Sequence, residues 1–481
     1  MQGPFIVSLD LGTSGCRAEA VTPDGKIFSQ TREPLLPLRD TDGTSYYRAE
    51  DLWTVQRRVL DALLAQLSPS QVAGIAVSSQ RSTVVLWNER TGEAVAPVLT
   101  WEDGRAVHQV QQAAISQESV HGITGLYKTP YFSAPKIAWC LQNLQDAKET
   151  LEAGNLCVGS VATYFIWKLT HGAVFATDIS LAQRMLLLDM NTAAWSAELC
   201  HAFAVPAFCL PTIQPSSSLY GTYTYQGVDI PILSCVADQQ AAAYWMNLHP
   251  AQSCINYGTG AFLLYNTDRQ AALLPGMLTS LAPDDGTGIR YFLEGPVNAA
   301  GSIFLWLNAQ GFSCTTEELD ALCNASKHPV EFLPALGGLG APYFDVTAKP
   351  AVANLSASTR KADWVAGAAR GLAFLLTDIA VYLKQHGYEQ KYPVLVSGGL
   401  SRLDYLLRFQ TDLLQCPVRV VREADATLLG AAKLAALQAG WDLSTWAVEI
   451  SSELQPQRSV QEAQHLYQSW QKFVTISRKQ A

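Results

Sequence analysis

The sequence predicts an α/β protein of two domains, each built on a mixed sheet. Its 481 residues exceed what a single hydrophobic core usually serves. Near the N-terminus, a meander of three strands is followed by helix and strand in alternation, which is typical of a mixed α/β sheet. An apolar strand that breaks into a Gly-Thr turn occurs in both halves, at residues 5–15 and 255–262. The similar order of elements in the second half indicates a duplicated fold.

In the first half, short apolar runs predict strands, and leucine and valine at helical spacing predict a long helix. The run Pro23-Asp24-Gly25 is a strong turn signal between the second and third strands. The expected elements are strands at residues 5–9, 17–22 and 26–30, a helix at 50–67, strands at 72–78 and 232–237, and a helix at 239–246.

The second half repeats this order after a proposed domain boundary near residues 240–254. That boundary divides the chain into an N-terminal domain at 1–245 and a C-terminal domain at 246–481. The expected elements of the second half are a strand hairpin at 255–265, a helix at 362–385, a strand at 394–396, a helix at 403–414, a strand at 418–421 and a helix at 427–439.

The composition excludes several classes of protein. The net charge is −9, and no run of lysine and arginine could follow a phosphate backbone, so we expect no nucleic-acid partner. The ten cysteines are scattered without a Cys-x-x-Cys pair, which suits neither a zinc site nor a disulfide scaffold. The N-terminus has no basic region before an apolar core, and no apolar run reaches the roughly 20 residues of a membrane helix. We therefore expect a cytoplasmic protein with no membrane partner.

The two Gly-Thr turns are candidate phosphate loops. In the first, glycine lets the chain turn sharply, so backbone N–H groups and the hydroxyls of Thr13 and Ser14 can face a phosphate. Asp10 precedes the turn, where a divalent cation would be needed, although a turn-capping aspartate is the competing interpretation. The second turn is Gly258-Thr259-Gly260. One such turn is more often an ordinary tight hairpin, but two that face one another indicate a nucleotide cleft between domains.

Asp238 is the candidate general base. It follows the apolar strand at 232–237 and precedes the helix at 239–246, which places its carboxylate at a strand end. Transfer of a phosphoryl group needs such a base, besides positioning and charge neutralisation. Taken alone, an aspartate at this point is as well explained as a helix N-cap.

Further motifs accompany these residues in a fixed order along nearly the whole chain, and together they resemble the FGGY carbohydrate kinase family. The signature aromatic-x-Ser-x-x-Lys-x-x-Trp of that family is matched by Tyr131 to Trp139. The motifs are Asp10-Leu11-Gly12-Thr13-Ser14 with Arg17, Ser79-Gln80-Arg81-Ser82, Trp101-Glu102-Asp103-Gly104-Arg105, Tyr131 to Trp139, Asp238-Gln239-Gln240, Tyr257-Gly258-Thr259-Gly260, Gly338 to Tyr343, and Gly398-Gly399.

The resemblance implies two domains of the actin and RNase H type, with ATP and substrate bound in the cleft between them. It implies transfer of the γ-phosphoryl group of ATP to a primary hydroxyl, with Asp238 as base and Mg²⁺ at Asp10. ATP would be held by Thr13, Ser14, Arg17, Gly258, Thr259, Gly260, Gly398 and Gly399. The acceptor would be bound by Arg81, Ser82, Trp101, Tyr131, Asp238, Gln239 and Phe262.

Within the family, the chain is most similar to the kinases of glycerol, and one departure concerns the acceptor. Those kinases carry a glutamate directly after the substrate arginine, where this chain has Ser82. Loss of that charged acceptor costs about 1.5–3 kcal/mol if nothing compensates. The expected substrate is therefore glycerol or a similar short polyol, with a tetritol or a pentulose such as xylulose or ribulose as alternatives.

Two further points stay open. A nucleotide-gated interaction or sensor protein of the actin-like fold is the alternative from another class, because fold alone does not decide function. The family's asparagine beyond Gly398-Gly399 is replaced, with Leu403 and Asp404 at the candidate positions, so the adenine contacts are open. Related kinases are often oligomers, so a homo-oligomer also stays open.

Overall fold

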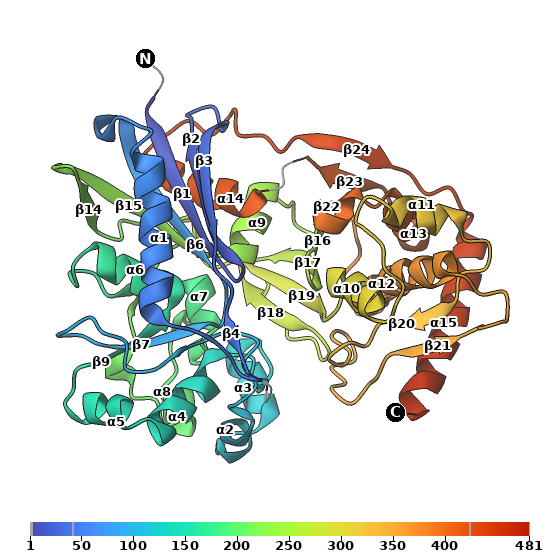
Figure 1. The fold of residues 1–481 in the computed structure, drawn as a ribbon, viewed down its shortest axis with the longest axis horizontal. Helices are drawn as coiled ribbons and strands as arrows, with labels where there is room; N and C mark the ends of the chain where they lie inside the picture. The colour runs from blue at the N-terminus through green and yellow to red at the C-terminus, as the bar shows by residue number, and fades with distance from the viewer. Residues whose placement is uncertain (1–2, 41–42, 423–424, 481) are drawn as a thin grey trace.

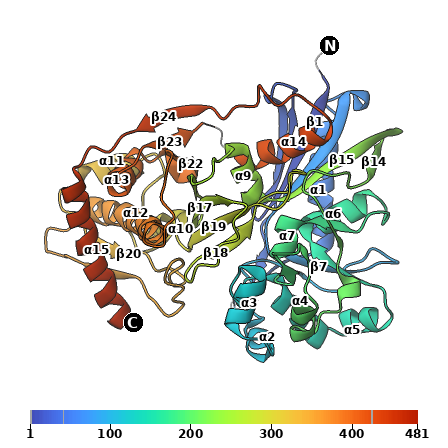
Figure 2. The same ribbon diagram turned by 180° about the vertical axis from the view of Figure 1, so that it is seen from behind.

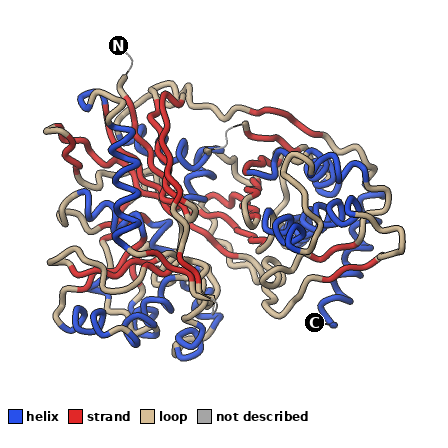
Figure 3. The backbone as a smooth tube through the Cα atoms, in the orientation of Figure 1, coloured by secondary structure: helices blue, strands red, loops and turns tan. Residues whose placement is uncertain are grey.

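The computed structural model describes residues 3–40, 43–422 and 425–480. Met1 and Gln2, at the start of the chain, lie outside the described residues. Two halves lie side by side in Figure 1, with the N-terminal half on the left. Each half is built around one large sheet, whose strands are drawn red in Figure 3.

The first sheet combines antiparallel and parallel pairing. β1 pairs antiparallel with β2 on one side and parallel with β6 on the other, and β6 pairs parallel with β15. In spatial order, the strands are β14 (Thr222–Tyr225), β15 (Val228–Ala237), β6 (Val72–Ser79), β1 (Phe5–Gly12), β2 (Gly15–Val21) and β3 (Ile27–Pro34).

The second sheet repeats this pattern. β16 pairs antiparallel with β17 and parallel with β22, and β22 pairs parallel with β23. In spatial order, the strands are β18 (Leu278–Leu281), β19 (Tyr291–Val297), β17 (Ala261–Asp268), β16 (Ser253–Tyr257), β22 (Val394–Gly398), β23 (Val418–Val421) and β24 (Ile450–Leu454). The repeated pairing confirms the predicted α/β class with a mixed sheet in each half.

Both faces of the first sheet are covered, as the first strand shows. Its residues are buried from Phe5 to Leu11, and successive side chains point to opposite faces. Phe5, Val7 and Leu9 pack with α1 (Ala49–Leu64). Ile6 packs on the opposite face with α9 (Asp238–Met246) and α14 (Ala426–Gln438).

The helix α14 comes from the C-terminal part of the chain but packs on the first sheet (Figures 1 and 2). Small residues allow this close approach. A Cβ atom added at Gly430 would lie 1.9 Å from the Ala241 carbonyl oxygen, so only glycine lets α14 meet α9 here. The Ser8 hydroxyl also donates a 2.7 Å hydrogen bond to the Leu428 carbonyl. Each sheet is thus built from one continuous part of the chain, but α14, which covers the first sheet, comes from the part that builds the second.

The second sheet is covered by helices from the C-terminal half of the chain, most of which lie between its strands in sequence. The longest of the described helices, α12 (Lys361–Gln385), is long and apolar enough to cross a membrane by length and composition alone, but 72% of its apolar stretch is buried inside the protein. It therefore packs as a core helix. Its companions are α10 (Gly301–Ala309), α11 (Leu319–Ala325), α13 (Asp404–Leu414) and α15 (Val460–Gln480).

A smaller sheet lies beside the first one and carries most of the remaining helices. Its strands, in spatial order, are β4 (Leu38–Arg39), β5 (Ser45–Tyr47), β8 (Val98–Leu99), β7 (Val84–Asn88) and β9 (Leu156–Ser160). The helices of the first half besides α1 and α9 are α2 (Val107–Gln112), α3 (Gln117–Thr124), α4 (Ser133–Asn143), α5 (Gln145–Glu152), α6 (Val161–Leu169), α7 (Ile179–Gln183) and α8 (Ala197–Ala202).

Short pairs and turns complete the chain. The two-stranded pairs are β10 (Ala176–Asp178) with β13 (Thr212–Gln214), β11 (Leu188–Asp189) with β12 (Ala194–Trp195), and β20 (Glu331–Leu333) with β21 (Ala351–Ala353). The 3₁₀ turns are Pro69–Gln71, Ala207–Cys209 and Gly399–Arg402.

The predicted strands and helices lie where the sequence placed them, with differences at their ends. Two of the larger differences concern β15, which was expected to begin at residue 232 and begins at Val228, and β3, which was expected to end at residue 30 and continues to Pro34. Three of the four residues added to β3 are polar, and β3 is an edge strand whose side chains mostly alternate between exposed and half-buried. Pairing of Gly15 with Pro34 extends the strand, because backbone hydrogen bonds need no apolar side chains there.

Candidate active site

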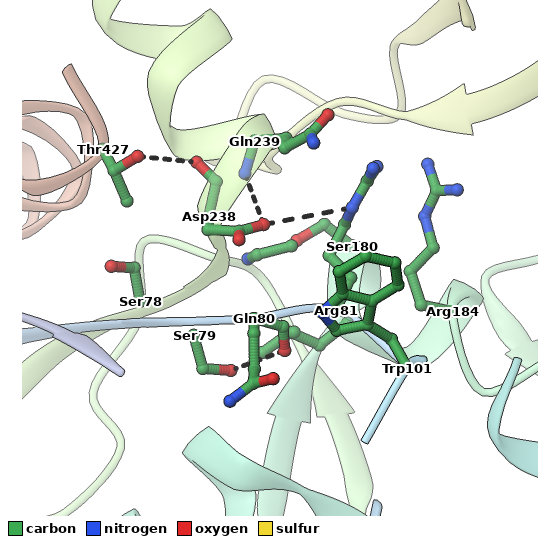
Figure 4. Close-up of polar contacts among 12 residues, drawn as sticks. Ser78, Ser79, Gln80, Arg81, Trp101, Ser180, Arg184, Asp238, Gln239 and Thr427 are labelled. Carbon is green, nitrogen blue, oxygen red and sulfur yellow. Dashed lines mark hydrogen bonds and ion pairs between the residues drawn. The ribbon is translucent and has the colours of Figure 1, made fainter. Parts of the chain in front are cut away.

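The candidate acceptor residues meet at the junction of the two halves. Arg81, two residues beyond the end of β6, is almost fully buried. Its guanidinium carbon lies 5.4 Å from the centre of the Phe262 ring, which belongs to β17 of the other half. Its Nε atom lies 3.9 Å from Oδ1 of Asp238. Figure 4 shows Arg81 and Trp101 on the side of Asp238 opposite Thr427.

Asp238 begins α9 directly after β15, as the sequence predicted. The side chain is 31% exposed, so a ligand can reach its carboxylate. Its Oδ1 atom accepts a 2.7 Å hydrogen bond from the Gln239 N–H. Desolvation by the surrounding protein raises the pKa of Asp238 to about 6, and Asp10 adds to this, while Arg81 opposes it. At neutral pH the group is an ionised base with a higher proton affinity than an ordinary aspartate.

Two aromatic side chains form a wall near this cluster. The rings of Trp101 and Tyr131 lie 5.5 Å apart, centre to centre. The indole Nε1 of Trp101 donates a 3.0 Å hydrogen bond to the Thr13 hydroxyl, which joins the acceptor wall to the first candidate phosphate loop. Burial raises the pKa of Tyr131, so its phenol stays protonated and can donate a hydrogen bond.

Ser82 and Gln239 both keep polar atoms without a partner in the described part of the chain. The Ser82 hydroxyl is buried, and the backbone at Ser82 has φ of +62°, in the left-handed region that side chains rarely adopt. The side-chain oxygen of Gln239 is also buried without a hydrogen bond. Buried polar atoms without partners are uncommon, so these two are available to hydrogen-bond a ligand.

A buried ionic cluster, which the sequence did not reveal, lies behind Arg81. The carboxylate of Glu294, on β19, accepts hydrogen bonds from Arg81 at 3.1 Å and from Arg184 at 2.6 Å. The Ser280 hydroxyl donates to the same carboxylate at 2.7 Å. Burial alone would raise the pKa of Glu294, but Arg184 and Arg81 outweigh it and hold this pKa at about 2. Glu294 is therefore ionised and fixes Arg81 in place.

A sequence signal for this cluster exists but is weak. Glu294 interrupts the apolar strand that begins at Tyr291, and Arg184 stands in an equally apolar stretch. A charge in a buried run indicates an ion pair, because an unpaired buried charge is costly. Nothing in the sequence names the partner.

The first candidate phosphate loop is the turn between β1 and β2. The buried carboxylate of Asp10 accepts a 2.6 Å hydrogen bond from Arg17, and the Ser78 hydroxyl donates to it at 3.3 Å. Arg17 also pairs with Asp425, at the start of α14. Ser14 is exposed at the tip of the turn. Residues from distant parts of the chain therefore surround Asp10.

The second candidate loop is the turn between β16 and β17, where Gly258 and Thr259 are exposed. The turn is tight, since the Gly258 N–H donates a 2.9 Å hydrogen bond to the Gly260 carbonyl. A Cβ atom added at Gly260 would lie 2.8 Å from the Val297 carbonyl oxygen. Glycine is thus required by the close approach of neighbouring backbone.

Gly398 and Gly399 lie at the end of β22 and line a cavity of about 350 Å³. Gly398 has φ of +92°, and a Cβ atom there would lie 2.3 Å from the Tyr257 carbonyl oxygen, so this turn borders the second loop. Arg402 and Asp404 line the same cavity. Among the residues that the structure describes, this glycine turn has no hydrogen bond or ion pair with Arg81 or Asp238. The turn and the acceptor cluster are therefore not directly linked in the described part of the chain.

Comparison with known proteins shows which family this chain resembles along its length. Two domain models of the FGGY family of carbohydrate kinases match the chain. The N-terminal domain of the family matches residues 5–244, and the C-terminal domain matches residues 254–439. The glycerol kinase of Carboxydothermus hydrogenoformans is 32% identical over 500 residues, which covers 100% of this chain and 99% of that protein.

Solved structures of carbohydrate kinases share this fold over nearly the whole chain. The crystal structure of Plasmodium falciparum glycerol kinase with ADP superposes with a TM-score of 0.91 at 25% identity, over 98% of both chains. A xylulose kinase from Rhodospirillum rubrum, at 21% identity, superposes with a TM-score of 0.86 over 99% of both chains and shares the fold.

Proposed function

The chain belongs to the FGGY family of carbohydrate kinases, and from that premise we propose that it transfers the γ-phosphoryl group of ATP to a primary hydroxyl of glycerol. The family resemblance expected from the motifs is confirmed, and the chain is an ATP-dependent phosphotransferase. The observation that carries the proposal is the position of Asp238, whose carboxylate lies 3.9 Å from Arg81, itself packed against Phe262 of the other half.

The proposed reaction needs one proton transfer. Asp238 accepts the proton of the acceptor hydroxyl, and the oxygen attacks the γ-phosphorus as the bond to the β-phosphate oxygen breaks and ADP leaves. A pKa of about 6 leaves Asp238 ionised at neutral pH yet more basic than an ordinary carboxylate. Arg81, held by Glu294, orients the acceptor oxygens, and Trp101 with Tyr131 packs against the carbon chain.

The residues near the first loop fit Mg²⁺ bound together with ATP. Mg²⁺ usually takes one or two protein carboxylates and completes its shell with waters and substrate phosphates. Asp10 offers one buried carboxylate at the strand end, and the described residues hold no group of three acidic, histidine or cysteine side chains that could form a permanent metal site. When bound, Mg²⁺ would neutralise phosphate charge; Asp10 would hold it, and the glycine turns would cradle the phosphates.

The similarity to glycerol kinases supports glycerol as the acceptor, while Ser82 is the feature that bears on specificity. The serine hydroxyl is neutral, so it offers the acceptor hydroxyls no charged hydrogen-bond acceptor of the kind that a carboxylate would. We propose that Arg81, Gln239 and Asp238 supply most of the polar contacts, and that Phe262 closes the site from the other half. We further propose that the enzyme works in the cytoplasm on small molecules.

A coupled assay of ADP release tests the proposal. Purified protein with Mg-ATP is offered glycerol, erythritol, threitol, xylulose and ribulose, and kcat/KM is compared. Glycerol is expected to give the highest value. A higher kcat/KM for a tetritol or a pentulose would replace glycerol as the substrate. ATP binding without turnover on any acceptor would favour the nucleotide-gated sensor.

A further inference from the structure

The side chain of Lys136 is buried at the acceptor site without an acidic partner. It lies on α4 and has no exposed surface, and it forms no ion pair with any residue that the structure describes. Its ammonium group instead donates hydrogen bonds to two backbone carbonyls, at 3.1 Å to Ser82 and at 2.6 Å to Tyr131. Both of these residues are candidate acceptor contacts.

A lysine in this position is costly unless it has a role. Burial penalises the charged form and lowers the pKa of Lys136 to about 7, with Asp103 opposing the shift. An apolar side chain of similar length would fill the same volume without that cost. The two carbonyl contacts are what such a side chain could not provide.

The Ser82 carbonyl is a particular target. The backbone at Ser82 is held at φ of +62°, a conformation that costs free energy for any residue except glycine. Such a conformation persists only when its surroundings impose it. The Ser133 hydroxyl donates a second hydrogen bond, of 3.2 Å, to the same Ser82 carbonyl. Lys136 and Ser133 therefore fix the turn that follows Arg81.

The contact with Tyr131 joins this turn to the aromatic wall. The Tyr131 ring packs on Trp101, so the same ammonium group holds the peptide beside Arg81 and the peptide that carries the wall. The first turn of α4 also contacts the ionic cluster, since the Ser133 N–H donates to the Arg184 carbonyl at 3.4 Å. The segments that carry Arg81 and Tyr131 are thereby linked through one side chain.

We propose that Lys136 is a positioning residue that clamps the two acceptor-binding segments together through the Ser82 and Tyr131 carbonyls. This inference rests on the proposed function, because it takes Arg81 and Tyr131 as acceptor contacts. The clamp sets the position of the acceptor, and its two direct contacts involve no residue of the nucleotide loops.

Steady-state kinetics of Lys136→Met test the clamp. The expected result is a rise of about tenfold or more in the KM for glycerol with the KM for ATP nearly unchanged, since a small misplacement of binding groups is costly. The matched control is Lys128→Met. Lys128 also donates to two carbonyls, those of Ala113 and Ile115, but these lie outside the candidate site, so its KM for glycerol should not change. Equal changes in both KM values, or none, would overturn the proposal.

A second variant separates positioning from general destabilisation. Glycine adopts φ of +62° without strain, so in a Ser82→Gly background the turn needs less support. Lys136→Met should then raise the KM for glycerol by a smaller factor than it does in the parent. An unreduced factor would contradict the clamp. If Lys136→Met does not fold, Ser133→Ala replaces it, because that change removes one of the two side-chain donors to Ser82 and leaves the buried amine.

Hydrogen–deuterium exchange distinguishes failure of this inference from failure of the proposed function. Peptides covering residues 79–84 and 129–133 should exchange faster in Lys136→Met than in the wild type, whereas those covering 256–261 should not. This readout needs no substrate, so it tests the clamp even if glycerol is not phosphorylated. Unchanged exchange in the first two peptides would refute the clamp.

Discussion

The carboxylate of Glu294 lies 2.6 Å from the guanidinium of Arg184, although the two residues belong to opposite halves of the molecule. Both side chains are about 1% exposed, and Arg81 binds the same carboxylate. The Glu294 carboxylate thus contacts two buried cations at the junction, and Asp238 lies near one of them, Arg81. Because the ion pairs cross the junction, they restrict how far the two halves can separate at this point.

Glu294→Gln is expected to destabilise the protein by about 3–5 kcal/mol, because it leaves the buried Arg184 guanidinium without a counter-charge and leaves Arg81 with only the more distant Asp238. The measurement is urea unfolding followed by tryptophan fluorescence. Glu453→Gln is the matched control, since Glu453 pairs with Arg419 on the exposed edge of the second sheet. This substitution should lower the free energy of unfolding by less than about 1 kcal/mol. Similar losses in both variants would show that the buried position of Glu294 has no special weight.

The same carboxylate predicts a pH dependence of stability. The pKa of Glu294 is about 2 in the folded protein and near its ordinary value of 4.5 when unfolded. A lowered folded pKa contributes stability that is present above pH 4.5 and is lost as the pH falls toward 2. Acid unfolding curves of the wild type and of Glu294→Gln should therefore converge over this range. Curves that stay parallel would contradict the assignment.

Asp238→Asn should lower kcat by about 10²–10⁴-fold, because the amide cannot accept the proton of the acceptor hydroxyl. The affinity for ATP, measured by calorimetry, should stay close to that of the wild type. Asp229→Asn is the matched control, because Asp229 lies on the same strand β15 at its exposed end. A normal kcat in Asp238→Asn would remove this residue from the role of base.

The acid limb of the pH profile should report Asp238. Burial raises the pKa of Asp238 to about 6, and only the ionised form accepts a proton, so kcat/KM for the acceptor should fall as the pH decreases below 6. The profile is measured between pH 5 and 8 with saturating Mg-ATP. A flat profile down to pH 5 would assign the proton transfer to another group.

Asp10→Asn should raise the Mg²⁺ concentration needed for half-maximal activity by about 10–100-fold, the effect typical of removing a group that orients a metal's ligands. Activity is titrated with Mg²⁺ at fixed ATP. Asp24→Asn, at the exposed turn between β2 and β3, is the control and should leave the Mg²⁺ requirement unchanged. An equal requirement in both variants would exclude Asp10 from the metal site.

The sequence predicted those strands, helices and turns whose formation depends on residues close to one another in the chain. Apolar periodicity located β1 and α12, and turn residues located both Gly-Thr hairpins, since these features are local. Asp238 could be placed because it follows a strand and starts a helix. The ion pairs of Glu294 could not be predicted, because its partners lie 110 and 213 residues away in the chain. Pairing over such separations is decided by the tertiary fold.

The position of α14 was also beyond sequence reasoning. The sequence predicted a helix at residues 427–439, but a local pattern does not say which sheet that helix covers. Similarly, the φ of +62° at Ser82 has no signal in the residue itself. Only the surrounding carbonyl contacts explain it.

The placement of α14 on the first sheet has a consequence for synthesis of the protein on the ribosome. Ile6 and Val236 lie on the face that α14 covers, and α14 is completed only at Gln438. The first half therefore emerges with part of this apolar face unprotected and cannot reach its final packing until nearly the whole chain is made. A nascent chain arrested after residue 245 is expected to bind chaperones that recognise exposed apolar surface, and release should require translation through α14.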